Sequence, residues 1–476
     1  MRTLSDRLLL GRLRFGLRSA GKDYSSSAII PFSILIPVIL FLYFDLSTQH
    51  WFLQLTGRHL LRIWIPPLVF FAAIFGGRLW KRELPIPLDW QTILFAVYGT
   101  ASLITLSLNE TPFAAVKYWL IMIAPVWMYF VILDSCDGSA HIESVLKWLF
   151  LGGFLLILYT LYLQGLIARN PDAVPLEMMT RSGQVISIAG EAFYKEKGID
   201  YSRGFLLYSC GHYGGILLFP FLFGVFQFFR NGTWIRWSFL ALSLIMSSQI
   251  INTLSRTDIV AMSFGLIVLW GALAYEGKSS KGQRRFVFLS VFAGMILYTV
   301  LFKPFLLGRF LQLLTFLDSA LVNQYILSEQ IAPAHHITAS DPHIVSAISS
   351  LQAFIERPLM GWGFSFTEQQ LHELNRYLFI LASTGVLTFS AYVFFWVGIL
   401  LSLGRSLIKE RHSSDTPTLA TYFISCIAML GIKFAYIGME TFYYWIIGSL
   451  AMAWVYTTEK SPAVSGRHAL QQNITD

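Results

Sequence analysis

Charged residues are scarce in this chain of 476 residues, since 13% are Asp, Glu, Lys or Arg whereas 55% are hydrophobic. In a typical soluble globular domain about a quarter of the residues are charged. The mean hydropathy of +0.58 points the same way. The composition therefore excludes an ordinary soluble protein and predicts a polytopic membrane protein.

Cysteine is equally rare, with three in the whole chain: Cys136, Cys210 and Cys426. No two of them have the CxxC spacing of a redox or zinc motif, and two lie within apolar runs. We therefore predict neither a disulfide nor a zinc site.

Motifs for nucleotides and metals are missing as well. There is no GxxxxGK[ST] loop and no GxGxxG after a strand, which argues against an ATP-driven pump. One group of residues is spaced too irregularly for a metal site: His335, His336, Asp341 and His343. We expect no metal and no cofactor. The net charge of +8 comes without a basic patch interleaved with aromatics, so we expect no nucleic acid partner.

Long apolar runs dominate what is present, and about twelve of them are long enough to cross a bilayer as helices. They occupy approximately residues 28–47, 60–77, 88–108, 112–133, 142–168, 204–229, 236–254, 258–275, 286–303, 378–402, 418–437 and 441–457. The predicted fold is an all-α integral membrane protein.

These runs divide the chain into five parts. Residues 1–24 mix arginines with leucines and predict an amphipathic segment on the cytoplasmic membrane face, the alternative being a disordered basic tail. Residues 25–303 hold spans one to nine. Residues 304–377 form a loop too long for a plain connection, and its helical periodicity predicts helices that cover the outer ends of the spans as a lid. Residues 378–457 hold spans ten to twelve, and 458–476 form a cytoplasmic tail.

The distribution of positive charge orients the spans. With both termini in the cytoplasm, more than half of the 35 lysines and arginines fall in inner segments, as the positive-inside rule requires. The exception is 134–143, which is acidic and carries little base. We predict a multi-pass membrane protein with the 304–377 loop outside.

The stretch NTLSRTD, residues 252–258, separates two apolar runs with almost no loop between them. An arginine at such a turn lies at or slightly inside the membrane boundary, and at a span centre it would cost roughly 2.5–3.5 kcal/mol. Arg256 therefore either faces a wet, protein-lined cavity where it can meet an anion, or pairs with Asp258.

Other polar residues are expected at the same depth. Arg203 begins the sixth span and His372 precedes the tenth. Two guanidinium groups suit a diphosphate, because each can bind phosphate oxygens bidentately, and a neutral histidine can take a proton from a sugar hydroxyl. The plainer alternatives are an Arg203 that snorkels to the interface and a His372 that is structural. Lys433 and Glu440 either form an ion pair or line the same cavity.

Four stretches together resemble the O-antigen ligase and polysaccharide polymerase superfamily. LSRTDIVAMSFGLIVL is similar to its SRTG-type signature, and YSRGFLLYSCGHYGGILLFP to its Arg-Gly-Phe start of a span. LQAFIERPLMGWGF resembles the end of the family's large outer loop, and LNRYLFILASTGVLTF the start of the next span. The resemblance covers about residues 200–400, with the motifs in the family's order.

The resemblance implies a metal-independent, inverting glycosyltransferase whose donor is a glycan on undecaprenyl diphosphate. Arg203 and Arg256 match the arginines that bind the diphosphate, and Lys433 is a further candidate for that role. The family places its catalytic histidine directly before an asparagine, whereas here Leu374 precedes Asn375. The candidates for the catalytic base are therefore His372, Glu373 and Glu440.

We thus expect transfer of the glycan to an acceptor sugar hydroxyl, with polymerisation of O-antigen or exopolysaccharide repeats favoured. The alternative acceptor is the lipid A core of lipopolysaccharide, which would make the protein a ligase. Membrane lipids and a chain-length regulator are the other expected partners. A secondary transporter or flippase is the alternative of another class, and it predicts charges near the membrane midplane rather than at one face.

Overall fold

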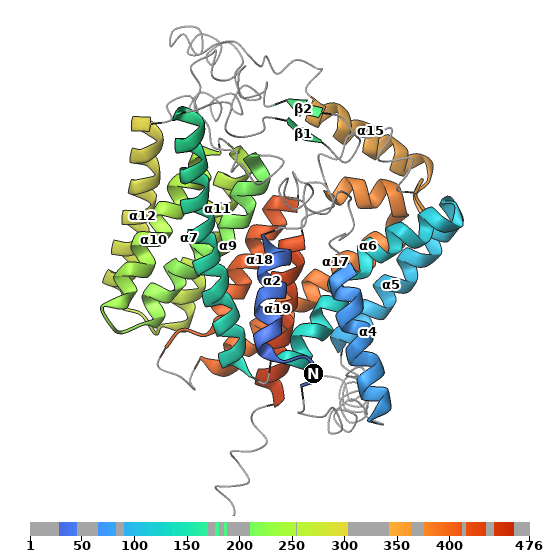
Figure 1. The fold of residues 1–476 in the computed structure, drawn as a ribbon, viewed down its shortest axis with the longest axis horizontal. Coiled ribbons are helices and arrows are strands. Elements are labelled where there is room, and N and C mark those ends of the chain that lie inside the picture. The colour runs from blue at the N-terminus through green and yellow to red at the C-terminus, as the bar shows by residue number, and fades with distance from the viewer. Residues whose placement is uncertain are drawn as a thin grey trace, which may run out of the picture.

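The computed structural model describes residues 28–44, 65–81, 90–136, 138–169, 177–179, 185–187, 210–253, 255–302, 342–363, 376–411, 416–434 and 442–460. These residues form a bundle of apolar helices (Figure 1). The helices are α2 (Phe32–Tyr43), α4 (Ile65–Trp80), α5 (Trp90–Asn109), α6 (Pro112–Ser135), α7 (Ser139–Arg169), α9 (Cys210–Arg230), α10 (Ile235–Asn252), α11 (Arg256–Glu276), α12 (Lys281–Phe302), α15 (Pro342–Glu356), α17 (Arg376–Glu410), α18 (Leu419–Phe434) and α19 (Phe442–Lys460).

The prediction of an all-α architecture is confirmed, with one small departure. Strands β1 (Glu177–Met179) and β2 (Val185–Ser187) pair antiparallel, Met178 opposite Ile186. Each predicted apolar run overlaps one helix, and the ends differ most at α17, which continues to Glu410 because the apolar pattern runs on past residue 402.

Six helices of the described chain are long and apolar enough to cross a membrane: Thr92–Asn109, Ser139–Tyr162, Tyr213–Arg230, Thr257–Glu276, Lys281–Phe302 and Tyr377–Glu410. Shorter apolar helices accompany them, among them α2 and α18. Large apolar side chains on the outward faces stay exposed, such as Leu289 and Ile296 of α12. Such an apolar surface fits contact with lipid, because soluble proteins rarely expose contiguous apolar patches of that extent.

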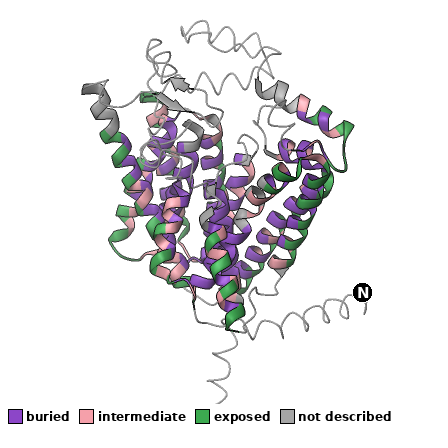
Figure 2. Cartoon of the chain, turned by 45° about the vertical axis from the view of Figure 1, so that its right-hand side comes forward, coloured by how far each residue is buried: buried purple, intermediate pink, exposed green. Residues whose placement is uncertain are grey.

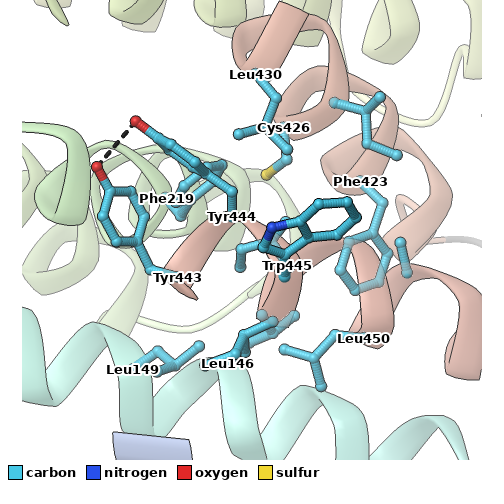
Figure 3. Packing of buried hydrophobic residues seen from close by; sticks show 14 of the residues in the cluster. Leu146, Leu149, Phe219, Phe423, Cys426, Leu430, Tyr443, Tyr444, Trp445 and Leu450 are labelled. Atoms are coloured by element: carbon cyan, nitrogen blue, oxygen red, sulfur yellow. Dashed lines mark hydrogen bonds between the residues drawn. The ribbon is translucent and has the colours of Figure 1, made fainter. Parts of the chain in front are cut away.

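Helix α9 lies at the centre of the bundle and α12 at its edge. In the apolar segment long enough to cross a membrane, 94% of the residues of α9 are buried, but only 22% of those of α12. Figure 2 shows the same contrast between buried and exposed helices. Helix α9 packs against α7, α10, α11 and α18, while α11 pairs closely with α18 and α5 with α17. Aromatic rings fill the space beside α9, where Phe219 contacts Tyr443 and Tyr444 (Figure 3).

At the lower end of the bundle in Figure 1, where α2 begins, a buried ion pair joins Arg78 of α4 to Asp134 of α6. The Oδ1 atom of Asp134 accepts hydrogen bonds from Nε and an Nη of Arg78, and its Oδ2 atom accepts from the backbone N–H groups of Ile29 and Ile30. One carboxylate thus joins the start of α2 to the ends of α4 and α6. Glu143, another acid of the stretch expected as an acidic loop, is paired with Arg230. Asp134 and Glu143 thus belong to helices and are paired with arginines, whereas Asp137 lies outside the described residues.

At the upper end, the chain after α15 docks onto a break in α17. The helix is interrupted at Gly385, whose φ is 69° and ψ −176°. The N–H groups of Trp362 and Gly363 donate to the carbonyls of Ala382 and Ser383 at 2.9 and 2.8 Å, and Val386 donates to Pro358 at 2.8 Å. The break leaves helix carbonyls without hydrogen-bond donors from α17 itself. The N–H groups of the docked chain are the donors in their place.

We expect Gly385→Ala to lower the thermal stability of the protein, because its φ of 69° with ψ of −176° lies in a region that is essentially restricted to glycine and costs an L-residue about 1–3 kcal/mol. A Cβ atom at this position would also overlap the carbonyl of Leu359. Gly404→Ala in the same helix is the matched control, since nothing lies within 4 Å of its Cβ position. Size-exclusion chromatography after heating in detergent measures both variants, and equal midpoints would contradict the assigned break.

Candidate functional site

Of the residues predicted to form a site, Lys433 is the one whose side chain the structure describes, and it is buried. Arg256 is the first residue of α11, with its backbone described but not its side chain. The remaining positions fall outside the described residues: Arg203, His372, Glu373 and Glu440.

The NTLSRTD stretch folds into a capped turn between α10 and α11. Ser255 is the N-cap of α11, and its side chain accepts a hydrogen bond from the backbone N–H of Asp258 at 3.4 Å. Thr253 ends α10, where its hydroxyl donates to the carbonyl of Ile250 at 2.7 Å and accepts from the N–H of Ser255 at 3.3 Å. A serine cap and an acid in the first turn are what a helix start favours, so this local sequence accounts for the position of Arg256.

Lys433 of α18 forms an ion pair with the Oδ1 atom of Asp258 in α11. Both side chains are almost completely buried, with exposed fractions of 1% and 0%. Two opposite charges taken out of water stabilise each other, whereas either one alone would be costly to bury. Asp258 is therefore an ion-pair partner of Lys433. The sequence had suggested that Asp258 pairs with Arg256 and that Lys433 pairs with Glu440.

Two glycines of α9 make room for this pair. A Cβ atom at Gly214 would overlap the Oδ2 atom of Asp258 and lie 3.2 Å from the hydroxyl of Thr253. A Cβ atom at Gly215 would overlap the hydroxyl of Tyr443 and lie 3.2 Å from Cε of Lys433. The CGHYGG sequence thus lets α9 approach α11, α18 and α19 where the charges meet.

The surrounding helix ends are tied to the same place. The hydroxyl of Tyr377, at the start of α17, donates to the carbonyl of Gly431 at 3.0 Å, one half-turn before Lys433. On the other side, the hydroxyl of Tyr298 in α12 donates to Oδ1 of Asn252 at 2.8 Å. We call the group of Thr253, Ser255, Asp258, Lys433 and Tyr443, with Gly214 and Gly215, the upper polar cluster.

The ion pair reduces the net positive charge of the upper polar cluster. The ammonium group of Lys433 is neutralised by Asp258, so the pair carries no net charge. The Oδ2 atom of Asp258 has no hydrogen-bond partner among the described residues and lies against Gly214. The pair thus supports the first turn of α11, in which Arg256 stands, and the binding of a diphosphate by Lys433 stays a prediction.

The pairing of Asp258 with Lys433 could have been suggested by the sequence, although it was not predicted from neighbouring residues. Asp258 and Lys433 each lie inside an apolar run, at the start of α11 and in the last turn of α18. Since a buried charge needs a partner of opposite sign, the two were candidates for each other despite a separation of 175 residues.

Metal ligation finds no support in the described residues, where no group of three or more His, Cys, Asp or Glu side chains could hold an ion. The irregular histidine group lies outside the description, apart from the backbone of His343 in α15. His212 belongs to α9, but its side chain is not described.

Comparison with known proteins gives no match, either to a family model or to a curated protein sequence. The site is therefore interpreted from its own residues.

We expect Lys433→Met alone to destabilise the protein by about 3–5 kcal/mol, because the carboxylate of Asp258 is left buried without a counter-charge. The double variant Asp258→Asn with Lys433→Met removes both charges and should recover most of this loss. Unfolding in detergent of the two single variants and the double variant forms a double-mutant cycle. Strictly additive losses would show that the two side chains do not interact. Lys147→Met is the control, since its pair with Glu143 leaves Lys147 53% exposed and should change stability by less than about 1 kcal/mol.

Gly214→Ala should also destabilise the protein, since a methyl group there displaces the carboxylate of Asp258 from its position. Gly271→Ala in α11 is the matched control, because nothing lies within 4 Å of its Cβ position and a helical alanine is favoured over glycine by up to about 1 kcal/mol. Thermal midpoints in detergent test the pair. A Gly214→Ala variant as stable as Gly271→Ala would show that α9 does not approach Asp258 this closely.

Proposed function

We propose that the protein is an inverting glycosyltransferase of the bacterial inner membrane. It transfers a glycan from undecaprenyl diphosphate to an acceptor sugar hydroxyl at the outer face, and the favoured reaction is the polymerisation of O-antigen or exopolysaccharide repeat units. In this proposal the upper end of the bundle in Figure 1 faces outward.

The proposed topology uses about twelve helices as spans, with both termini in the cytoplasm. Six of the described helices have the length and hydropathy for this role, which supports the proposal. The lower turns also carry basic residues such as Lys278, Lys281 and Arg284, in keeping with a cytoplasmic location of that end.

The observation that carries the proposal is the construction of the α11 start. The pair of Asp258 with Lys433 fixes the first turn of α11 within the protein, and Arg256 stands in that same turn. Two positive charges attract an anion at this position: the guanidinium group of the arginine and the partial positive charge of the helix N-terminus. A diphosphate is the anion that the family resemblance suggests.

The other predicted site residues lead into the upper polar cluster along the chain. Arg203 precedes the first residue of α9 by seven positions, and α9 contributes Gly214 and Gly215. His372 and Glu373 come shortly before Tyr377, which bonds to the Lys433 turn. Glu440 is three residues before Tyr443. Three sequence segments that carry predicted site residues thus lead into helices that surround Asp258 and Lys433, which supports a shared site.

The proposed reaction is a single displacement. The oxygen of the acceptor hydroxyl attacks the anomeric carbon of the donor, the bond from that carbon to the phosphate oxygen breaks, and its electron pair leaves with undecaprenyl diphosphate. The hydroxyl proton passes to a base, for which His372, Glu373 and Glu440 are the candidates. Arg203 and Arg256 stabilise the charge that develops on the leaving diphosphate. Lys433, neutralised by Asp258, serves first to hold the α11 start, and this refines its expected role.

The position of charge favours an enzyme over a carrier. The buried charged residues of the described chain are Arg78, Asp134, Asp258, Glu276 and Lys433. Each lies in the first or last turns of its helix. A secondary transporter would be expected to hold such residues near the midplane, at broken helices in corresponding halves.

Arg256→Ala in a strain that lacks the native gene tests the proposal through the glycan on the cell surface. A polymerase predicts a single-repeat band in place of a ladder, because the donor diphosphate is no longer bound productively. A ligase predicts core without glycan, with long chains left on the lipid carrier. Arg285→Ala is the control, because Arg285 is exposed at the opposite end of the bundle and should leave the ladder unchanged. An unchanged ladder in Arg256→Ala, at equal protein level, would exclude Arg256 from the mechanism.

A further inference from the structure

Helix α15 has three distinct faces along its described side chains. Ser350 and Ala353 are buried against α17, and the Nε1–H of Trp362 donates to the carbonyl of Ala353 at 2.8 Å. Leu351 and Ile355 are exposed, Ile355 at 72%. Gln352 and Glu356 are exposed as well. The helix therefore shows an outward surface that is half apolar and half polar.

The angles between these faces are informative. Successive residues of a helix are about 100° apart around its axis. The centre of the apolar face therefore lies about 100° from the centre of the polar face and about 150° from that of the buried face. The polar face lies about 110° from the buried face. A helix that lies flat beside a protein has the protein inward, so its outward surface divides into an upper and a lower half. The apolar and polar faces of α15 divide it in this way, which is the pattern of a helix in a membrane interface.

The neighbouring contacts place α15 at the level where apolar helices end. Asn109, the last residue of α5, donates from Nδ2 to the carbonyl of Met360 at 2.9 Å. Large apolar side chains are exposed on the segments that meet near this bond: Leu359 after α15, Leu108 on α5 and Phe113 on α6. In Figure 1, α15 runs across the upper end of the bundle rather than along the helices below it.

The chain after α15 carries a tryptophan and an arginine in contact. The guanidinium carbon of Arg357 lies 3.9 Å from the ring centroid of Trp362. Tryptophan with a basic residue beside it is the pair that membrane proteins concentrate at the boundary between acyl chains and headgroups. This second feature agrees with the depth indicated by Asn109.

We propose that α15 is an interfacial membrane helix, with Leu351, Ile355 and Leu359 inserted among the lipid acyl chains of the leaflet at the upper end of the bundle. Gln352 and Glu356 face the aqueous side. The occupant of the apolar face is lipid, because the hydrogen bond of Asn109 to Met360 sets this face beside the end of α5, where apolar side chains are exposed as well. The inference requires membrane insertion only and is independent of the glycosyl transfer proposed above.

Spin labels on the two outward faces test the proposal in the full-length protein. The native Cys136, Cys210 and Cys426 are first replaced by alanine, and single cysteines are introduced as Leu351→Cys, Ile355→Cys, Gln352→Cys and Glu356→Cys. Each is labelled with a nitroxide after reconstitution into vesicles of phosphatidylethanolamine and phosphatidylglycerol. Collision rates with oxygen, which concentrates in acyl chains, and with a water-soluble nickel chelate are then compared.

The labels at Leu351 and Ile355 should collide with oxygen several-fold more effectively, relative to nickel, than those at Gln352 and Glu356. Labels equally open to nickel on both faces would overturn the proposal, since α15 would then lie in water. Labels at Leu351 and Ile355 shielded from both reagents would overturn it as well, since another protein surface or a second copy would cover that face. All four positions are exposed, so the variants keep the buried contacts of α15 intact.

Discussion

The buried ion pair between Asp258 and Lys433 is the interaction on which the upper end of the bundle depends. It joins α11 to α18 inside an apolar protein, where either charge alone would be costly to bury. Helix α9 reaches this pair only because Gly214 and Gly215 have no side chains, and Tyr443 of α19 packs beside the lysine. Four helix ends are thereby held in one arrangement around a single neutral pair of charges.

The lower end of the bundle follows the same principle with different residues. Asp134 accepts from Arg78 and from two backbone N–H groups, so both carboxylate oxygens are used. Glu276, at the end of α11, accepts from the N–H and hydroxyl of Thr418 at 3.0 and 2.8 Å and so caps the start of α18. Helices α11 and α18 are therefore joined by a polar contact at each end, with apolar packing between. This arrangement sets the register of the two helices more firmly than apolar side chains alone.

The helices were predictable from the sequence because length and hydropathy are local properties, and each apolar run corresponds to one described helix. The break at Gly385 was not, since a glycine in an apolar run does not reveal a positive φ until the chain from 358 to 363 docks against it. The partner of Lys433 was also missed. In the sequence, Glu440 is the nearby charged residue for Lys433, and Arg256 is the nearby one for Asp258. The contact between α11 and α18, which pairs Lys433 with Asp258, arises only in the folded structure. Arg203, His372, Glu373 and Glu440 stay predictions, because they lie outside the described residues.

The neutrality of the Asp258–Lys433 pair also bears on how an anion could be bound nearby. A site that held Arg203, Arg256 and a free Lys433 would concentrate three positive charges and would bind its diphosphate product tightly. With Lys433 neutralised, the proposed site carries two positive charges from the arginines, and the lysine contributes rigidity in place of charge. In the proposed reaction this balance would favour turnover, because interactions that hold the transition state and the product equally do not speed the reaction and slow the release of the product. A carboxylate fixed two residues after Arg256 is thus consistent with the proposed site, which would bind a diphosphate and then release it.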